Sequence, residues 1–235
     1  MPRKQYDEPK EQRIASVAAG DTGRPECVRA TGAAGAAPGK WGMMTGSDDA
    51  IDALAGLPAD SGLRALRPEA RAYAQKSYEA LFLRPARDMM PLDERLAIAC
   101  FVAGLHQDAP AIEHYGALLL DSPAASLSAA IAAAASAGAT TGPYGAFPPG
   151  PLSVEDMSGP HYAADAAALG PRLAAAFKHA HLLVFHPRDA GRTAIEDLVA
   201  AGWSSTEIVT LSQLISFLTF QIRTAGGLRL LAATK

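Results

Sequence analysis

The longest run of apolar positions lies near the C-terminal end of the chain, over residues 195–231. Its first part ends at Gly202, and a glycine just past a periodic apolar segment is typical of a helix end. Ser204 or Ser205 can cap a second helix, and Glu207 then places a carboxylate at the positive end of that helix. The residues that follow are apolar nearly all round, which a helix on a protein surface cannot be. The pattern therefore predicts a central helix.

Shorter periodic runs predict further helices ahead of this one. Asp48 and Asp49 form an acidic cap for a short helix, Pro68 suits the first turn of a longer one, and Asp93 is the predicted cap of a helix that begins at Glu94. The predicted helices cover residues 50–57, 63–84, 94–105, 109–120, 124–139 and 161–185, the last with a kink or break at Gly170 and Pro171. No segment shows the sustained alternation of a strand, so the predicted fold class is all-α.

Two of these helices begin alike. Arg-Leu-Ala at residues 95–97 and again at 172–174 opens an apolar helix, and each helix is followed by a histidine-containing bend and a second helix. This is a weak internal repeat, consistent with a duplicated helical unit. Between the two copies, residues 140–160 form a loop rich in glycine and proline. A loop of this length in a compact domain is either functional or an arm that holds an oligomer together.

The N-terminal part of the chain has no sustained apolar periodicity and is rich in glycine, alanine, proline and charge. Such a segment cannot offset the entropy of ordering, so we predict a disordered tail over residues 1–46 and a helical domain over residues 47–235. Met43 and Met44 stand immediately before the first helical pattern. We therefore expect natural translation to start there, with the residues upstream being a gene-model extension.

Composition narrows the classes of partner. Acidic residues outnumber basic ones by 24 to 21, a net charge of -3, and this argues against the basic field that nucleic acid or an anionic membrane requires. The Ala-rich run at 124–139 is shorter than the roughly 20 apolar residues of a membrane span. Only Cys27 and Cys100 occur, too few for a disulfide framework, which favours a reducing cytoplasm.

Three histidines lie close together in the sequence, His179, His181 and His186. The first two are two residues apart and cannot share a helix face, so we expect no metal site from these residues. No cofactor is expected elsewhere in the chain. His186 and Pro187 look like the exit of a helix.

The predicted C-terminal helix carries three polar exceptions, Gln213, Gln221 and Arg223. Gln213 and Gln221 share one helical stripe with Phe217 and Phe220. Two interpretations remain open, because a buried polar group needs a partner. Either the glutamines bond to neighbouring backbone within a core helix, or the stripe lines a pocket where Gln213, Gln221 and Arg223 contact a substrate.

One family resemblance is carried by this segment. A Gly-Trp-Ser turn at residues 202–204, Ile-Val-x-Leu-x-Gln-Leu at 208–214, an aromatic pair, Arg223 and a Gly-Leu pair follow one another. The sequence resembles the carboxymuconolactone decarboxylase and alkyl hydroperoxidase D superfamily, most of all its peroxidase-related branch. The likeness is fullest over residues 188–231 and weaker over 92–121. It implies an alkyl-hydroperoxidase-D-like helical bundle, a homo-oligomer and an oxidoreductase or peroxidase activity.

This chain lacks part of the redox centre that the hydroperoxidase members contain. That centre is a Glu, a Cys-x-x-Cys about a dozen residues later, and a His one turn beyond. The matching unit begins at Glu94, but His106 and Ala109 stand where the cysteines would be, and His114 lies near the place of the motif's His. Cys100 is the remaining redox candidate, within an apolar helix where a lone thiol is usually inert.

The decarboxylase members work without the cysteine pair and imply a second chemistry. Proton transfer could come from Glu94, His106 and His114, since histidine titrates near neutral pH, and Arg223 could pair with a substrate carboxylate. We therefore weigh a peroxidase-related protein, an acid–base enzyme for a small carboxylated substrate, and a non-catalytic helical scaffold. Convergence of Glu94, His106 and His114 in one pocket would favour catalysis.

Overall fold

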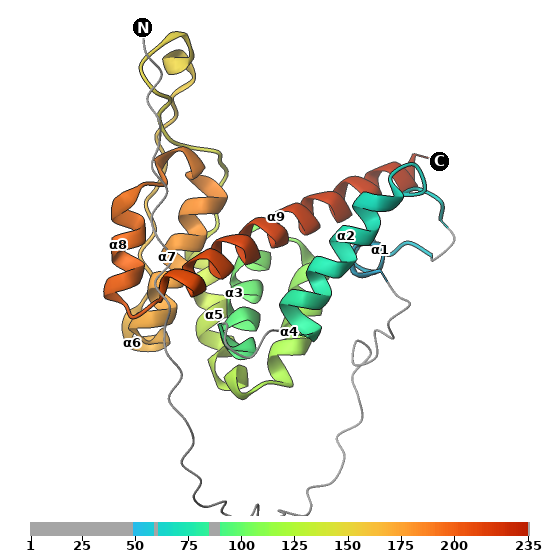
Figure 1. Ribbon diagram of the computed structural model, residues 1–235, viewed down its shortest axis with the longest axis horizontal. Helices are drawn as coiled ribbons and strands as arrows, with labels where there is room; N and C mark the ends of the chain where they lie inside the picture. The colour runs from blue at the N-terminus through green and yellow to red at the C-terminus, as the bar shows by residue number, and fades with distance from the viewer. Residues whose placement is uncertain (1–48, 59–60, 85–89, 235) are drawn as a thin grey trace, which may run out of the picture. The chain divides into compact units, whose positions relative to one another are not determined.

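The computed structural model describes residues 49–58, 61–84 and 90–234, all of which belong to one compact unit at 38–235. The predicted tail at 1–46, with Met43 and Met44, lies outside the described residues. The helices, labelled in Figure 1, are α1 (Ala50–Leu54), α2 (Pro68–Tyr78), α3 (Leu92–Leu105), α4 (Ala109–Leu120), α5 (Ser128–Gly138), α6 (Ala166–Leu169), α7 (Pro171–Phe185), α8 (Arg192–Ala200) and α9 (Ser205–Ala233). Short turns of other helix types are η1 (Glu79–Leu83), η2 (Pro123–Leu127), η3 (Pro151–Glu155) and η4 (Pro187–Asp189). The all-α prediction is confirmed for the described residues.

Most predicted boundaries agree with the structure, and the differences have local causes. Asp108 caps α4, accepting a hydrogen bond from the Ala111 amide at 3.1 Å. Helix α3 begins earlier than predicted, at Leu92, and Asp93 lies in its first turn instead of capping it. The predicted helix at 161–185 is two helices, because Gly170 adopts a φ of 78° between them and ends α6.

The innermost helix is α3. It packs against α4, α5, α7 and α9, and its residues 96–99 and 101–103 are buried. The Phe101 ring stacks on the Phe177 ring of α7 at 4.1 Å between centroids, which joins the two halves of the bundle. Gly104 allows α5 to approach closely, since a Cβ placed there would lie 2.5 Å from the Cβ of Ala135.

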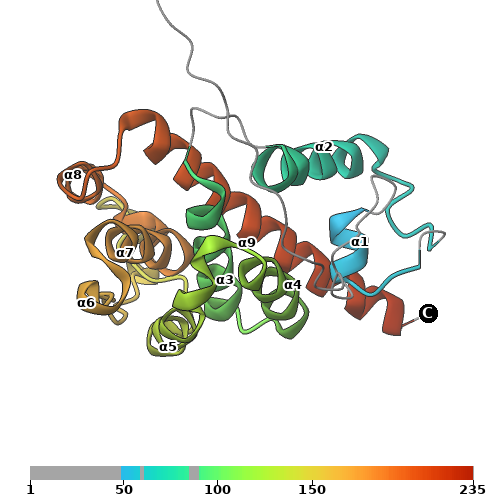
Figure 2. The ribbon, with the colours of Figure 1, turned by 90° about the horizontal axis from the view of Figure 1, so that it is seen from below.

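The long helix α9 crosses the bundle and contacts α1, α3, α7 and α8 (Figures 1 and 2). Its start follows the prediction, because Ser204 caps the Glu207 amide while the Glu207 carboxylate accepts from the Ser204 amide. The prediction that it is buried all round is wrong. Gln213, Phe220 and Arg223 are exposed on one side, while the opposite face packs on the bundle.

The two copies of the predicted repeat, α3 and α7, pack against each other and against α9. Their matching arginines nevertheless hold different partners. Arg95 is buried and donates to the carbonyl oxygens of Met90 and Leu81. Arg172 is partly exposed and lies over the Trp203 ring. The likeness between the copies therefore stops at the order of helices. Within the described ranges, no helix is both long and apolar enough to cross a membrane.

Candidate functional site

The residues predicted to form a catalytic site are not brought together. Glu94 lies in the first turn of α3 and His106 follows the last turn, so roughly 18 Å of helix separates them. The Glu94 carboxylate pairs with Arg172, at 2.8 Å from Oε1 to Nε and 3.1 Å from Oε2 to Nη2, and Arg172 also pairs with Glu207. Glu94 therefore links α3, α7 and α9, as an ion-pair partner with no nearby histidine among these contacts.

His106 and His114 occupy two different surroundings. His106 Nε2 lies 3.2 Å from Thr219 Oγ1, and burial, with a smaller effect of the Arg223 charge, lowers its pKa to about 4. His114 Nε2 lies 2.9 Å from the Tyr78 hydroxyl in an aromatic cluster, and burial also lowers its pKa to about 4. Both imidazoles are neutral at pH 7, and neither of them lines the cavities described below.

The predicted substrate stripe on α9 contributes no residue to the cavities described below. Gln213 and Arg223 are exposed together with Phe220, whereas Gln221 is buried and accepts a hydrogen bond from the Tyr115 hydroxyl. The Nε2 atom of Gln221 has no hydrogen-bond partner among the described residues. Gln221 therefore takes a core position with a side chain, and not neighbouring backbone, as its partner, while Gln213 and Arg223 lie on the exposed side of the helix.

Cys100 lies on α3 at the inner wall of a cleft between α3, α4 and α5 with a volume of about 850 Å³. Burial raises the pKa of its thiol to about 12. The reactive form of cysteine is the thiolate, so this thiol is a poor nucleophile at neutral pH. Cys27, the other cysteine, lies outside the described residues.

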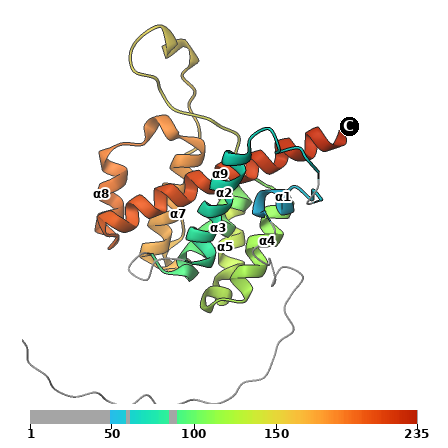
Figure 3. The same ribbon diagram turned by 45° about the vertical axis from the view of Figure 1, so that its right-hand side comes forward.

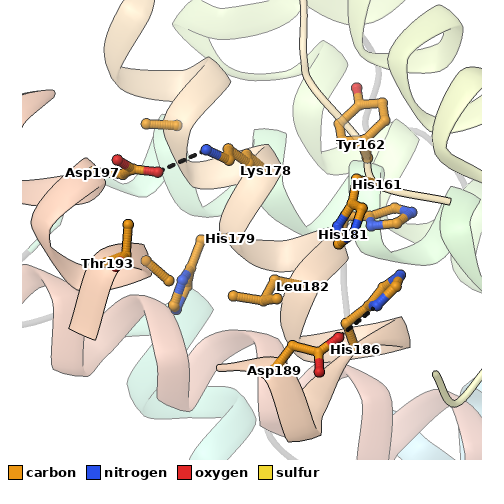
Figure 4. Close-up of a pocket in the computed structure, with 12 residues that line it drawn as sticks. His161, Tyr162, Lys178, His179, His181, Leu182, His186, Asp189, Thr193 and Asp197 are labelled. Carbon is orange, nitrogen blue, oxygen red and sulfur yellow. Dashed lines mark hydrogen bonds and ion pairs between the residues drawn. The ribbon is translucent and has the colours of Figure 1, made fainter. Parts of the chain in front are cut away.

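A second cavity, of about 240 Å³, gathers four histidines (Figure 4). It lies between α7, α8 and the segment that precedes α6. We call it the histidine pocket and define it by the side chains that carry its chemistry, namely His161, Lys178, His179, His181, His186 and Asp189. Three of these histidines, at 179, 181 and 186, are the ones assessed from the sequence as possible metal ligands, and His186 also as the exit of a helix.

Helix α7 supplies most of the wall. Ala175, Lys178 and Leu182 share one face at spacings of three and four residues, with His179 beside them, and His186 continues that face just past the end of the helix. His181 lies on the neighbouring face, where its ring stacks on that of Tyr162 at 5.1 Å. The cavity extends over both faces, so side chains two residues apart in sequence both reach it.

His186 is held at both ring nitrogens. Nδ1 lies 3.0 Å from Oδ2 of Asp189, and Nε2 lies 3.0 Å from the carbonyl oxygen of Pro160. Both partners accept, so each of the two bonds is donated by the ring nitrogen that faces it, and together they fix the orientation of the ring. The bond from His186 is also the main reason that the pKa of Asp189 is lowered.

His181 is the buried histidine that lies next to His186 in the pocket. It is buried, its ring centroid lies 5.9 Å from that of His186, and it bonds to the backbone of Gly138. Burial, and next the charge of His186, lower its pKa to about 4. The pocket thus holds two neighbouring buried imidazoles in different surroundings, His181 with a lowered pKa and His186 with both ring nitrogens bonded, and the exposed His161 stacks on His186 at 5.2 Å.

The other side of the pocket faces α8 and α9. Lys178 Nζ pairs with Asp197 of α8 at 2.7 Å at the rim. His179 is buried, with Nε2 at 3.4 Å from Ser212 Oγ of α9, and its Nδ1 has no hydrogen-bond partner in the part of the chain that the structure describes. Burial lowers the pKa of His179. Over the same residues, no group of three or more His, Cys, Asp or Glu is placed to hold a metal ion.

One feature of the sequence could have predicted part of this pocket. In His186-Pro187-x-Asp189 the proline ends the helix and the carboxylate follows three residues after the histidine, a spacing that lets the chain turn back to bond the ring. His161 gave no such signal, because it comes from a loop and reaches the pocket only through the fold.

A scan against protein-family models and a search of curated proteins both found no match to this chain. The fold and site define an all-α protein with a histidine-lined cavity, and its chemistry has to be argued from that cavity.

Proposed function

We propose that this chain is an acid–base enzyme that acts on a small carboxylated substrate in the histidine pocket. In this proposal it belongs to the decarboxylase-like side of the superfamily that residues 188–231 resemble, needs no cofactor, and works as a homo-oligomer in the cytoplasm. The observation that carries the proposal is the pair of unlike imidazoles, neutral His181 beside doubly bonded His186.

The support for an acid is a hydrogen-bond donor on each side of the cavity, Lys178 Nζ and the His186 ring, each of which is bonded to a carboxylate of the chain, Asp197 and Asp189. A substrate carboxylate would take the place of one of these partners. The cavity volume of about 240 Å³ is somewhat below the usual range of ligand sites and suits a small molecule. A carboxylate bound beside His186 offsets the charge that lowers the pKa of His181. This raises the pKa of His181 from its lowered value while the larger effect of burial remains, so the neutral imidazole is the form that accepts a proton.

The remaining contacts define the roles. His181 removes a proton from a carbon next to a carbonyl or carboxyl group and returns it to another carbon, which is the proton transfer of an isomerase or of a decarboxylase with double-bond migration. Asp189 and the Pro160 carbonyl fix the ring of His186 beside it. The peroxidase alternative has less support, because the thiol of Cys100 is held in its unreactive form.

Hydrogen exchange tests the proposal without a known substrate. Small lactone acids and unsaturated acids are incubated with the protein in D₂O, and loss of carbon-bound hydrogen is followed by proton NMR. We expect exchange in at least one acid, slowed by about 100-fold or more in His181→Gln, within the range of acid–base contributions.

His106→Gln is the matched control, since His106 is also a buried imidazole with a pKa of about 4 but lies outside the pocket. Its exchange rate should equal that of the unaltered protein. Exchange that survives in His181→Gln, or that is absent with every acid, would contradict the proposal.

A further inference from the structure

A long arm, residues 145–158, lies between α5 and α6. Its two ends pair through Gly145 and Met157, whose backbone bonds are 2.8 and 3.3 Å long. Figures 1 and 3 both show this segment extending away from the helices, with η3 at its tip. The arm is therefore a built projection with a closed base.

The tip of the arm is apolar and exposed. Leu152 and Val154 are 53 and 90% exposed, and Met157 at the base is 54% exposed. Prolines at 148, 149 and 151 restrict the backbone, and Asp156 accepts a hydrogen bond from the Phe147 amide at 2.6 Å, so the tip has little conformational freedom to lose on binding. A restrained apolar projection of this kind is suited to insertion into a partner.

The cleft between α3, α4 and α5 offers a matching cavity. We call it the apolar cleft, and its volume is about 850 Å³. Small residues make it deep, among them Gly104, Gly116 and Ala132, and the exposed side chains of Ile112 and Leu120 form its apolar rim. Figures 1 and 3 show α4 and α5 on the side of the bundle away from the arm, so the arm does not fill the cleft of its own chain.

The inserted part of the arm and the apolar cleft are alike in lacking charge as well as in being apolar. Residues 147–154 of the arm, FPPGPLSV, contain no charged side chain, and neither does the lining of the apolar cleft. Glu155, the last residue of η3, is exposed, and Asp156 accepts from the Phe147 amide, so only residues 147–154 suit insertion and both carboxylates would remain at the mouth of the cleft. An acidic or basic partner segment would have to lose its hydration in such a cleft without gaining an ion pair, whereas the arm would not.

We propose that the arm tip of one copy of this chain inserts into the apolar cleft of a second copy. Because the contact joins two different surfaces, the copies can form two kinds of closed assembly. One is a dimer in which each arm enters the partner's cleft, and the other is a ring in which each arm enters the cleft of the next copy. This inference does not depend on the chemistry of the histidine pocket.

Photocrosslinking tests the contact directly. A benzoylphenylalanine residue replaces Val154, and protein labelled with ¹⁵N is mixed with unlabelled protein, so that crosslinks between copies are recognised by mass. We expect mixed-isotope crosslinks to peptides that contain residues 100–139. The same probe in place of Leu66, which is almost fully exposed elsewhere, should not reach those peptides. Crosslinks only within one chain, or only to other helices such as α9, would overturn the proposal.

The mass of the assembly in solution gives a second measurement. Val154→Asp alters the tip and Ala132→Glu alters an exposed position of the cleft, so both should lower the mass measured by light scattering. Val199→Asp, at an exposed valine on α8, should leave the mass unchanged. A monomeric unaltered protein, or a cleft variant that keeps the full mass, would show that the arm and cleft do not join copies.

Discussion

Burial determines the chemistry of single residues throughout this chain, and Cys100 illustrates it most simply. The main cause of its raised pKa is burial and not a neighbouring acid or base. The low polarity of its surroundings raises the pKa of the thiol to about 12. The same loss of water acts on His181 in the opposite direction, because the charged form of histidine is the protonated one. Both residues are therefore neutral at pH 7.

The thiol pKa leads to a testable rate. In a Cys27→Ser protein, alkylation of Cys100 by iodoacetamide at pH 8 should be roughly a thousandfold slower than that of an ordinary cysteine, because the thiolate fraction falls in that ratio. Mass spectrometry over a pH series gives the rate. The rate should still rise above pH 10, and the same protein in urea provides the ordinary thiol for comparison. A plateau near pH 9 would show that the thiol is not held in its neutral form.

Residue positions on α9 show where sequence reasoning reaches its limit. Helical geometry places Gln221 about 80° around the helix from Gln213, enough to move it from the exposed side to the edge of the buried face. The helix is apolar on both sides, so its pattern could not reveal which side faces solvent. Ser204 and Glu207 were predictable because a helix cap is a local interaction.

At the scale of helices, the crossing of α3 and α5 depends on two small residues. The Ala-rich pattern at 124–139 predicts a face that allows close approach, and Ala135 on that face meets Gly104. The partner helix and the exact contact could not be predicted, because they depend on how distant segments fold together. The histidine pocket has the same origin, since His161 and His186 meet only once the loop before α6 lies against α7.

The crossing predicts a pair of compensating substitutions. Gly104→Ala should lower the free energy of unfolding by about 1–3 kcal/mol, because the added Cβ would lie 2.5 Å from that of Ala135. Adding Ala135→Gly removes the clash and should restore part of the loss, as measured by urea denaturation. Gly116→Ala in α4 is the matched control, because nothing lies within 4 Å of its added Cβ; it should be neutral or stabilising by up to about 1 kcal/mol. Equal effects at Gly104 and Gly116 would contradict a close crossing.

For the whole molecule, buried neutral histidines make stability depend on pH. His106, His114 and His181 have pKa values of about 4, below the ordinary 6.5. Between pH 6.5 and 4 the unfolded chain takes up protons that the folded chain does not, so acid favours unfolding. A fully buried histidine contributes roughly 3 kcal/mol over this range. The lowered pKa values of Asp189 and Glu207 act in the same direction, but only at lower pH.

We therefore expect the free energy of unfolding to fall steadily from pH 6.5 to pH 4. Urea denaturation at several pH values measures it. His114→Gln should reduce the slope, whereas His161→Gln, at an exposed position, should leave it unchanged. Stability that is flat over this range would show that these histidines are protonated in the folded chain.

The arm has one further consequence, which concerns cleavage of the backbone. Residues on both sides of its tip contact the histidine pocket: the Ala146 amide, near the start of the arm, bonds to Asp189 at 3.4 Å, and the Pro160 carbonyl, just past the arm, accepts from His186. A cut at the exposed tip, between Pro151 and Val154, leaves both of these contacts on their own side of the break. A nicked protein would then keep its pocket while losing the restrained tip, so a single proteolytic event would separate the proposed catalysis from the proposed assembly.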